Sequence, residues 1–216
     1  MKLSNKELQK IYFGAYNFAE TEDGYLQSFQ YTAEQIAYFK GAFDFWYERC
    51  TASTSKTIEI RTNAKKISFD YKFIWKGSDD SFEAMVDGLI TKIFYVKDLK
   101  EEGSLSFDLT AGLEGVYDNP DGMRDVVIYL PADATVVIKN FEIDGEYTPA
   151  KKSAKVLWLG DSITQGYGPL RSSQTYVSVA NRILNYDIIN QGIGGYVYDK
   201  KSLLKMEGYK PEKLIV

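Results

Sequence analysis

The spacing of apolar residues changes once along this chain, close to residue 150, and this change restricts the folds it can adopt. Before it, apolar and polar residues alternate, which is typical of strands with one buried face. This alternation predicts strands at 43–50, 56–62, 65–75, 104–110, 124–131 and 134–143. Two further strands flank Asp87-Gly88, a dipeptide that favours a tight hairpin turn.

Closely spaced strands with no long helix between them predict an antiparallel β-sandwich of jelly-roll type over residues 1–150. Two short helices are expected beside it. Ser4 with Glu7, and Thr32 with Gln35, have the spacing of a capping box, in which two side chains close the first turn of a helix.

Residues 151–216 have the pattern of a second domain. A polar segment at 146–155 precedes KVLWLG, a continuously apolar strand of the kind found in sheets covered on both faces. The elements predicted after it are a helix over 174–185, a strand over 186–192, a helix ending at Gly208 and a third strand from residue 213. This order of strands and helices builds a parallel α/β sheet, so the chain as a whole is predicted to be multidomain.

The predicted parallel sheet is short. A doubly wound sheet usually has about five or six strands, and the residues up to Val216 supply two or three. We therefore expect the 216 residues to be the front portion of a longer protein, truncated within its second domain. The apolar strand at 213–216 would leave an open sheet edge, which predicts self-association.

Composition argues against several kinds of partner. The net charge is −4 and no long basic run occurs, so we expect neither nucleic acid nor a membrane as a partner. The first ten residues are too polar for a signal peptide, and Cys50 has no second cysteine to pair with, which together predict a cytoplasmic protein. With one cysteine and no histidine, the sequence predicts no metal site and no cofactor.

The residues best suited to chemistry follow the first strand of the second domain. Ser162 comes directly after KVLWLGD, and ligands of open α/β sheets bind beyond the carboxyl ends of strands. Gly160 and Gly166 allow a tight turn there, and Asp161 is expected to brace it through hydrogen bonds. A second glycine-rich turn, NQGIGG at 190–195, follows the next strand. Both turns are therefore predicted at one edge of the sheet, where backbone N–H groups can stabilise an oxyanion.

These two turns carry a resemblance to a known family. GDSIT at 160–164, followed by Gly166, resembles the first block of the GDSL or SGNH hydrolases, and NQGIGG resembles their second block. The resemblance implies a three-layer, flavodoxin-like α/β domain with Ser162 as nucleophile. It also implies that the N–H groups of Ser162 and Gly195 hold the oxyanion. The residues expected to support this site are Gly160, Asp161, Gly166 and Asn190.

The family's other motifs, a Gly-x-Asn-Asp turn and an Asp-x-x-His, have no counterpart in these 216 residues. The resemblance implies that the base lies downstream of Val216. We expect the fragment alone to be inactive, because an unactivated serine hydroxyl is a poor nucleophile. A β-sandwich ahead of an SGNH domain also resembles the two-domain carbohydrate esterases, which remove acyl groups, often acetyl, from sugars. The complete protein is thus predicted to be a serine esterase acting on a carbohydrate or related small ester.

Two other interpretations stay open at this point. Gly-Asp-Ser after a strand could be a turn and helix cap alone, because Asp and Ser both favour those positions. The aromatic-rich sandwich could instead be a carbohydrate-binding module with Trp46 and Trp75 as contacts, the α/β part being a non-catalytic remnant. Tyr196 and Tyr198 could contact a substrate or pack over the second glycine turn.

Overall fold

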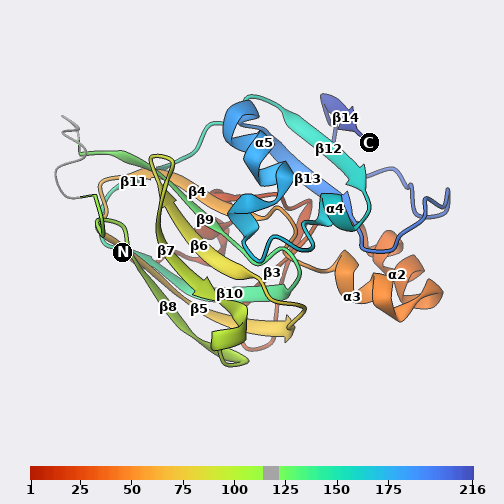
Figure 1. Cartoon of the computed structure of the whole chain (residues 1–216), viewed down its shortest axis with the longest axis horizontal. Coiled ribbons are helices and arrows are strands. Elements are labelled where there is room, and N and C mark those ends of the chain that lie inside the picture. The colour runs from red at the N-terminus through yellow and green to blue at the C-terminus, as the bar shows by residue number, and fades with distance from the viewer. Residues whose placement is uncertain (114–121) are drawn as a thin grey trace.

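The computed structural model describes residues 1–113 and 122–216 (Figure 1). Within these residues the helices are α1 (Asn5–Leu8), α2 (Ala33–Ala42), α3 (Asp44–Cys50), α4 (Ser162–Gln165) and α5 (Tyr176–Leu184), with short 3-10 helices η1 (Val96–Asp98) and η2 (Ser172–Gln174). The strands are β1 (Tyr12–Phe13), β2 (Asn17–Glu20), β3 (Leu26–Phe29), β4 (Thr57–Thr62), β5 (Lys66–Trp75), β6 (Ser81–Val86), β7 (Leu89–Tyr95), β8 (Glu102–Asp108), β9 (Arg124–Tyr129), β10 (Thr135–Ile143), β11 (Tyr147–Pro149), β12 (Lys155–Gly160), β13 (Asp187–Gly192) and β14 (Lys213–Ile215).

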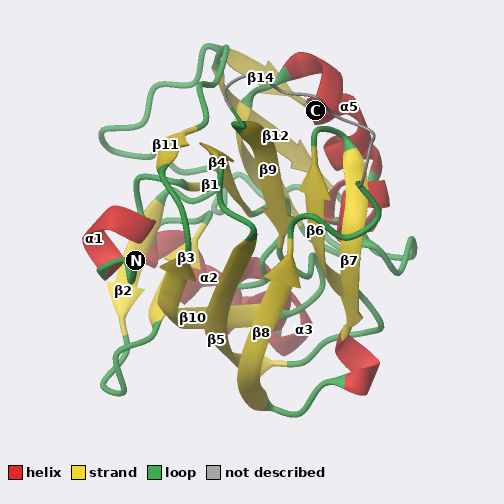
Figure 2. Cartoon of the chain, turned by 90° about the vertical axis from the view of Figure 1, so that its left-hand side faces the viewer, coloured by secondary structure: helices red, strands yellow, loops and turns green. Residues whose placement is uncertain are grey.

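The strands up to β11 form two antiparallel sheets. In the described part of the chain, one sheet has the order β1-β4-β9-β6-β7 with β11 beside β4, and the other has the order β2-β3-β10-β5-β8. Figure 2 shows them from the side that carries the N-terminus. Side chains of both sheets share one core, in which the rings of Phe69 and Phe82 lie 6.1 Å apart. The prediction of antiparallel sheets is confirmed, and the jelly-roll connectivity stays a prediction.

Strand β5 illustrates how the alternating pattern builds this core. Ile67, Phe69, Tyr71 and Phe73 are buried, whereas the residues between them are partly exposed. The predicted hairpin is also present. It joins β6 to β7 through Asp87 and Gly88, whose φ angles of 46° and 86° lie in the left-handed region that tight hairpin turns require.

Both predicted capping boxes are present. In α2 the Thr32 hydroxyl accepts a hydrogen bond from Gln35 N at 3.1 Å, and the Gln35 side chain accepts one from Thr32 N at 2.9 Å. Ser4 and Glu7 close the start of α1 in the same way. Each helix therefore begins where its sequence signal places it.

The strand predicted at 43–50 is wrong, because these residues include helix α3. Phe43, Trp46, Tyr47 and Cys50 are also spaced by three and four positions, so the segment fits a helical face as well as it fits alternation. Three of them, Trp46, Tyr47 and Cys50, pack into one hydrophobic cluster with Tyr31, Phe39 and Ile193. This packing selects the helical spacing over the alternating spacing of a strand.

The parallel sheet follows residue 150, with the strand order β13-β12-β14 within the described residues. β12 pairs with β13 along its whole length and with β14 on its other side. Val177 of α5 packs against Val156 and Trp158 of β12 and so covers one face of this sheet. The predicted third strand is confirmed as β14.

The helix predicted to end at Gly208 is wrong. Residues 193–212, all of which the structure describes, contain turns but no helix. Hydrogen bonds to α2 hold this segment instead. Tyr38 donates to the Asp199 carboxylate at 2.7 Å, and Gln35 Nε2 donates to Ser202 O at 2.7 Å. Over residues 1–113 and 122–216, no helix is both long and apolar enough to cross a bilayer.

Candidate functional site

Ser162 lies directly beyond the carboxyl end of β12. The strand ends at Gly160, Asp161 caps helix α4, and Ser162 is the first residue of that helix. The Asp161 carboxylate accepts a hydrogen bond from Ile163 N at 2.9 Å, so the helix begins at this position. The Ser162 side chain is half-buried, and none of the hydrogen bonds between described residues uses its hydroxyl.

The second glycine-rich turn lies at the same edge of the sheet. Gly160 at the end of β12 is in register with Gly192 at the end of the parallel strand β13. Ile193 N then donates to Gly160 O at 3.2 Å, which joins the two turns directly. The structure thus brings together the two segments that sequence spacing placed at one edge.

Close packing explains why glycine occupies three positions around α4. A Cβ on Gly160 would lie 1.9 Å from Thr164 Oγ1, and a Cβ on Gly192 would lie 2.4 Å from Gln165 N. Gly166 ends α4 with a φ of 105°, in the left-handed region that favours glycine. Side chains at 160 and 192 would push the serine-bearing helix away from the sheet, and a Cβ at 166 would lie 2.5 Å from Thr175 Cγ2.

Asn190 connects the second turn to α4. Its side chain is fully buried, and its Nδ2 donates to Thr164 O at 2.7 Å and to Ser55 Oγ at 2.8 Å. Its Oδ1 accepts from Gly192 N at 2.8 Å. Every polar atom of this amide therefore has a partner, as a buried amide requires. Gly195, five residues after Asn190, is exposed and has a φ of 66°.

Helix α3 contributes contacts that the sequence did not predict. Trp46 Nε1 donates to Gly195 O at 3.2 Å, and the Phe45 ring would lie 3.6 Å from a Cβ on Gly195. The Arg49 guanidinium stacks on Phe45 at 3.4 Å from the ring centroid. Figure 1 shows α2 and α3 beside α4, next to the ends of β12 and β13. Residues 43–50, predicted as a strand and found to include α3, thus form part of the wall of the candidate site.

The two tyrosines after the second turn have different environments. Tyr196 is half-buried and contacts Trp46 edge to face, with centroids 5.3 Å apart. Tyr198 is 48% exposed, and the partial loss of water around its phenol, followed by the nearby Asp161 carboxylate, raises the pKa of this group. Tyr196 therefore packs over the turn, whereas Tyr198 lies open to solvent.

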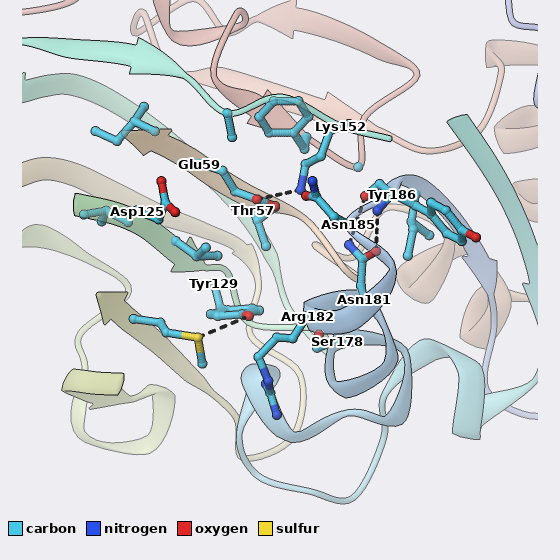
Figure 3. A pocket seen from close by; sticks show the side chains of 18 of the residues that line it. Thr57, Glu59, Asp125, Tyr129, Lys152, Ser178, Asn181, Arg182, Asn185 and Tyr186 are labelled. Atoms are coloured by element: carbon cyan, nitrogen blue, oxygen red, sulfur yellow. Dashed lines mark hydrogen bonds and ion pairs between the residues drawn. The ribbon is translucent and has the colours of Figure 1, made fainter. Parts of the chain in front are cut away.

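A cavity of about 720 Å³ lies elsewhere, between β4, β9 and α5 (Figure 3). None of its described lining residues belongs to either glycine turn. Its polar side chains largely pair with one another. Lys152 donates to Glu59 at 2.5 Å, and the Asn181 side chain bonds both backbone groups of Tyr186 (Figure 3). We therefore place the candidate site at the glycine turns.

Across the described residues, no group of three or more His, Cys, Asp or Glu side chains is arranged to hold a metal ion. What the site offers is a half-buried serine at the same sheet edge as the second glycine turn. A serine hydroxyl can attack a carbonyl carbon once a base removes its proton, and backbone N–H groups that point at the carbonyl oxygen stabilise the resulting oxyanion.

No protein-family profile matches the sequence, and no curated protein matches it either. Solved structures do share its fold. A salicylyl-acyltransferase from a tetracycline biosynthetic pathway, SsfX3, aligns with 84% of this chain and 51% of its own length, with a TM-score of 0.65 and 19% identity. A protein of Bacteroides ovatus described as a GDSL-like lipase aligns with 91% of this chain and 57% of its own, with a TM-score of 0.62 and 17% identity.

An acetyl xylan esterase from the rumen bacterium Butyrivibrio proteoclasticus is similar as well. It aligns with 91% of this chain and 49% of its own length, with a TM-score of 0.55 and 16% identity. The chain thus spans about half the length of these solved structures. At these identities the likeness establishes a common fold.

Proposed function

We propose that this chain is the serine-bearing part of an SGNH-type ester hydrolase. Ser162 would be the nucleophile, and the backbone N–H groups of Ser162 and Gly195 would hold the oxyanion. The observation that carries the proposal is the register of β12 and β13, which places both glycine turns at one sheet edge. The common fold with an acyltransferase and with an acetyl xylan esterase adds support.

The proposed reaction is acyl transfer to water through an acyl-serine. A base removes the Ser162 proton while the oxygen attacks the ester carbonyl, and the two N–H groups stabilise the negative charge that develops. The alcohol leaves with a proton, and water then releases the acid by the same steps. The 216 residues contain no histidine, so the proposal requires an imidazole from outside them. We expect no turnover by these residues alone.

We further propose that the antiparallel sheets form a sandwich domain over residues 1–150, joined to a flavodoxin-like domain from residue 151. The substrate would be an acylated, in particular acetylated, carbohydrate or related small ester, and the protein would work in the cytoplasm without nucleic acid or membrane partners. The acetyl xylan esterase among the similar structures supports this choice of substrate.

A carbohydrate-binding sandwich is less well supported. Its aromatic side chains Phe69, Phe82, Phe107 and Phe141 lie in the core. Trp46 bonds the second glycine turn, and Trp75 faces the Arg49 guanidinium at 5.0 Å. The two tryptophans considered for sugar contacts therefore lie against other side chains and the candidate site. Calorimetry with xylo-oligosaccharides on residues 1–150 separates the alternatives, since tight binding would favour the module.

The gene sequence beyond codon 216 gives the first test. The proposal predicts Gly-x-Asn-Asp soon after this point and Asp-x-x-His later. The complete protein should then hydrolyse p-nitrophenyl acetate, and Ser162→Ala should lower kcat by about 10⁴-fold or more. Ser106→Ala, at an exposed position on β8, is the matched control and should leave kcat unchanged. Full activity of Ser162→Ala would refute the proposal.

A further inference from the structure

Gln165, the last residue of α4, joins two segments that lie far apart in sequence. Its side chain is 1% exposed. Nε2 donates to Asp133 Oδ1 at 2.7 Å, and Oε1 accepts from Gly194 N at 2.7 Å. One amide thus bonds the loop between β9 and β10 through its nitrogen and the second glycine turn through its oxygen.

Asp133 is itself held firmly in place. It is 1% exposed, and its Oδ2 accepts hydrogen bonds from Ser78 N at 3.1 Å and Ser78 Oγ at 2.5 Å. Its backbone N donates to Asp80 Oδ2 at 3.1 Å, and Asp80 Oδ1 accepts from Ser172 Oγ at 2.9 Å. The carboxylate that orients Gln165 is therefore anchored in the antiparallel part of the molecule.

We propose that Gln165 is a positioning residue that fixes the second glycine turn relative to Ser162. Gln165 shares the short helix α4 with Ser162, and Gly194 directly precedes Gly195. The bond to Gly194 N therefore sets the distance between nucleophile and oxyanion donor. The inference rests on the proposed function for its effect on rate, whereas the clamp from Asp133 to Gly194 is testable without any activity.

The polarity of the clamp allows a swap experiment. The Asp133 carboxylate accepts from Ser78 on one oxygen and from Gln165 on the other. The amide of Asp133→Asn has only one oxygen, so one of these two donors loses its acceptor. In Gln165→Glu, two buried carboxylates face each other, which is unfavourable unless they share a proton. In the double variant, the new amide nitrogen at position 133 donates to the new carboxylate at 165. Its oxygen accepts from Ser78, the second oxygen at 165 accepts from Gly194 N, and every bond is restored.

Amide hydrogen exchange at Gly194, measured by NMR on the 216-residue chain, tests the clamp itself. Each single variant should exchange faster than the unmodified chain at pH 7.5, and the double variant should return to within about 3-fold of it. Gln165→Glu should regain protection as the pH falls and a shared proton binds. Gln9→Glu, at an exposed position in the N-terminal region, is the matched control and should change nothing.

Hydrolysis of p-nitrophenyl acetate by the complete protein tests the positioning role. Each single variant should lower kcat by about 10- to 100-fold with little change in KM, because a small misplacement of reacting groups is costly. The double variant should recover most of kcat. If Gly194 protection returns in the double variant but kcat does not, positioning by Gln165 is refuted. If the single variants do not fold, the proposed hydrogen bonds still require the double variant to fold. A double variant that does not fold would refute the clamp.

An unmodified protein without hydrolytic activity would refute the proposed function, while Gly194 exchange would still decide the clamp. If the Gly194 amide exchanges in the single variants at the same rate as in the unmodified chain, the clamp is refuted, whatever the activity of the protein. The two failures are therefore distinguishable.

Discussion

Lys56 offers a quantitative test of how the wall of the candidate site is held. Its side chain is 1% exposed, and Nζ donates to Ser28 O and Ala52 O, each at 2.9 Å. No carboxylate among the described residues pairs with it. Burial lowers the pKa of this amine from 10.5 to about 7. Ala52 follows helix α3, so Lys56 ties the end of that helix to β3.

The shift makes stability depend on pH in a defined direction. Between pH 7 and 10.5 the unfolded chain binds a proton at this lysine that the folded chain has lost, so stability rises with pH. Two pH units at about 1.36 kcal/mol per unit give a rise of at most about 3 kcal/mol between pH 7 and 9. Burial raises the pKa of the Cys50 thiol to about 12, which acts in the opposite direction above pH 9 and limits the window.

Urea unfolding at pH 6.5, 7, 8 and 9 measures this rise. The unmodified chain should gain stability across the series, and Lys56→Met should remove most of the gain, since methionine has no proton to lose. Lys66→Met, at an exposed lysine of β5, is the matched control and should keep it. A Lys56→Met variant with the same pH dependence as the unmodified chain would refute the reasoning.

Two further predictions concern the acidic range and the sheet edge. Burial raises the pKa of Asp80 to about 6, so the folded chain holds a proton that the unfolded chain has lost between pH 4 and 6. As the pH rises from 4 to 6, the free energy of unfolding of the unmodified chain should fall by up to about 3 kcal/mol relative to that of Asp80→Asn, as measured by urea unfolding. The same pH dependence in both proteins would contradict this. Among the described residues no strand pairs with the outer edge of β14, and Leu214 within this strand is 59% exposed, so the chain should self-associate in sedimentation experiments. Leu214→Lys should reduce this association. If the unmodified chain is a monomer at all concentrations, the prediction of self-association is wrong.

Features with a local signal can be predicted from this sequence. The hairpin at Asp87-Gly88 and the capping box of Thr32 with Gln35 each depend on a few adjacent residues, and both are present. The common edge of the two glycine turns follows from parallel pairing of consecutive strands, which the apolar pattern predicted. These features need no knowledge of the rest of the chain.

Segments whose local structure depends on distant contacts cannot be predicted in this way. Residues 43–50 fit two periodicities, and packing against Tyr31 and Ile193 selected the helix. The segment before Gly208 has helix-compatible spacing, yet hydrogen bonds from Gln35 and Tyr38 hold it as turns. Ile193, Gln35 and Tyr38 each lie more than 100 positions from the segment they contact, beyond the reach of any window of adjacent residues.

The same limit explains why Asp133 and Trp46 could not be predicted as supports of the candidate site. Asp133 and Gln165 are separated by more than 30 positions, and Trp46 lies farther still from Gly195. No spacing rule connects such pairs. The two sequence blocks predict where a nucleophile and an oxyanion donor would lie, but part of their support comes from outside the blocks, from Asp133 through Gln165 and from Trp46 of α3. It follows that substitutions outside the blocks, at Asp133 or Trp46, should also disturb the second glycine turn, which faster amide exchange at Gly194 and Gly195 would show.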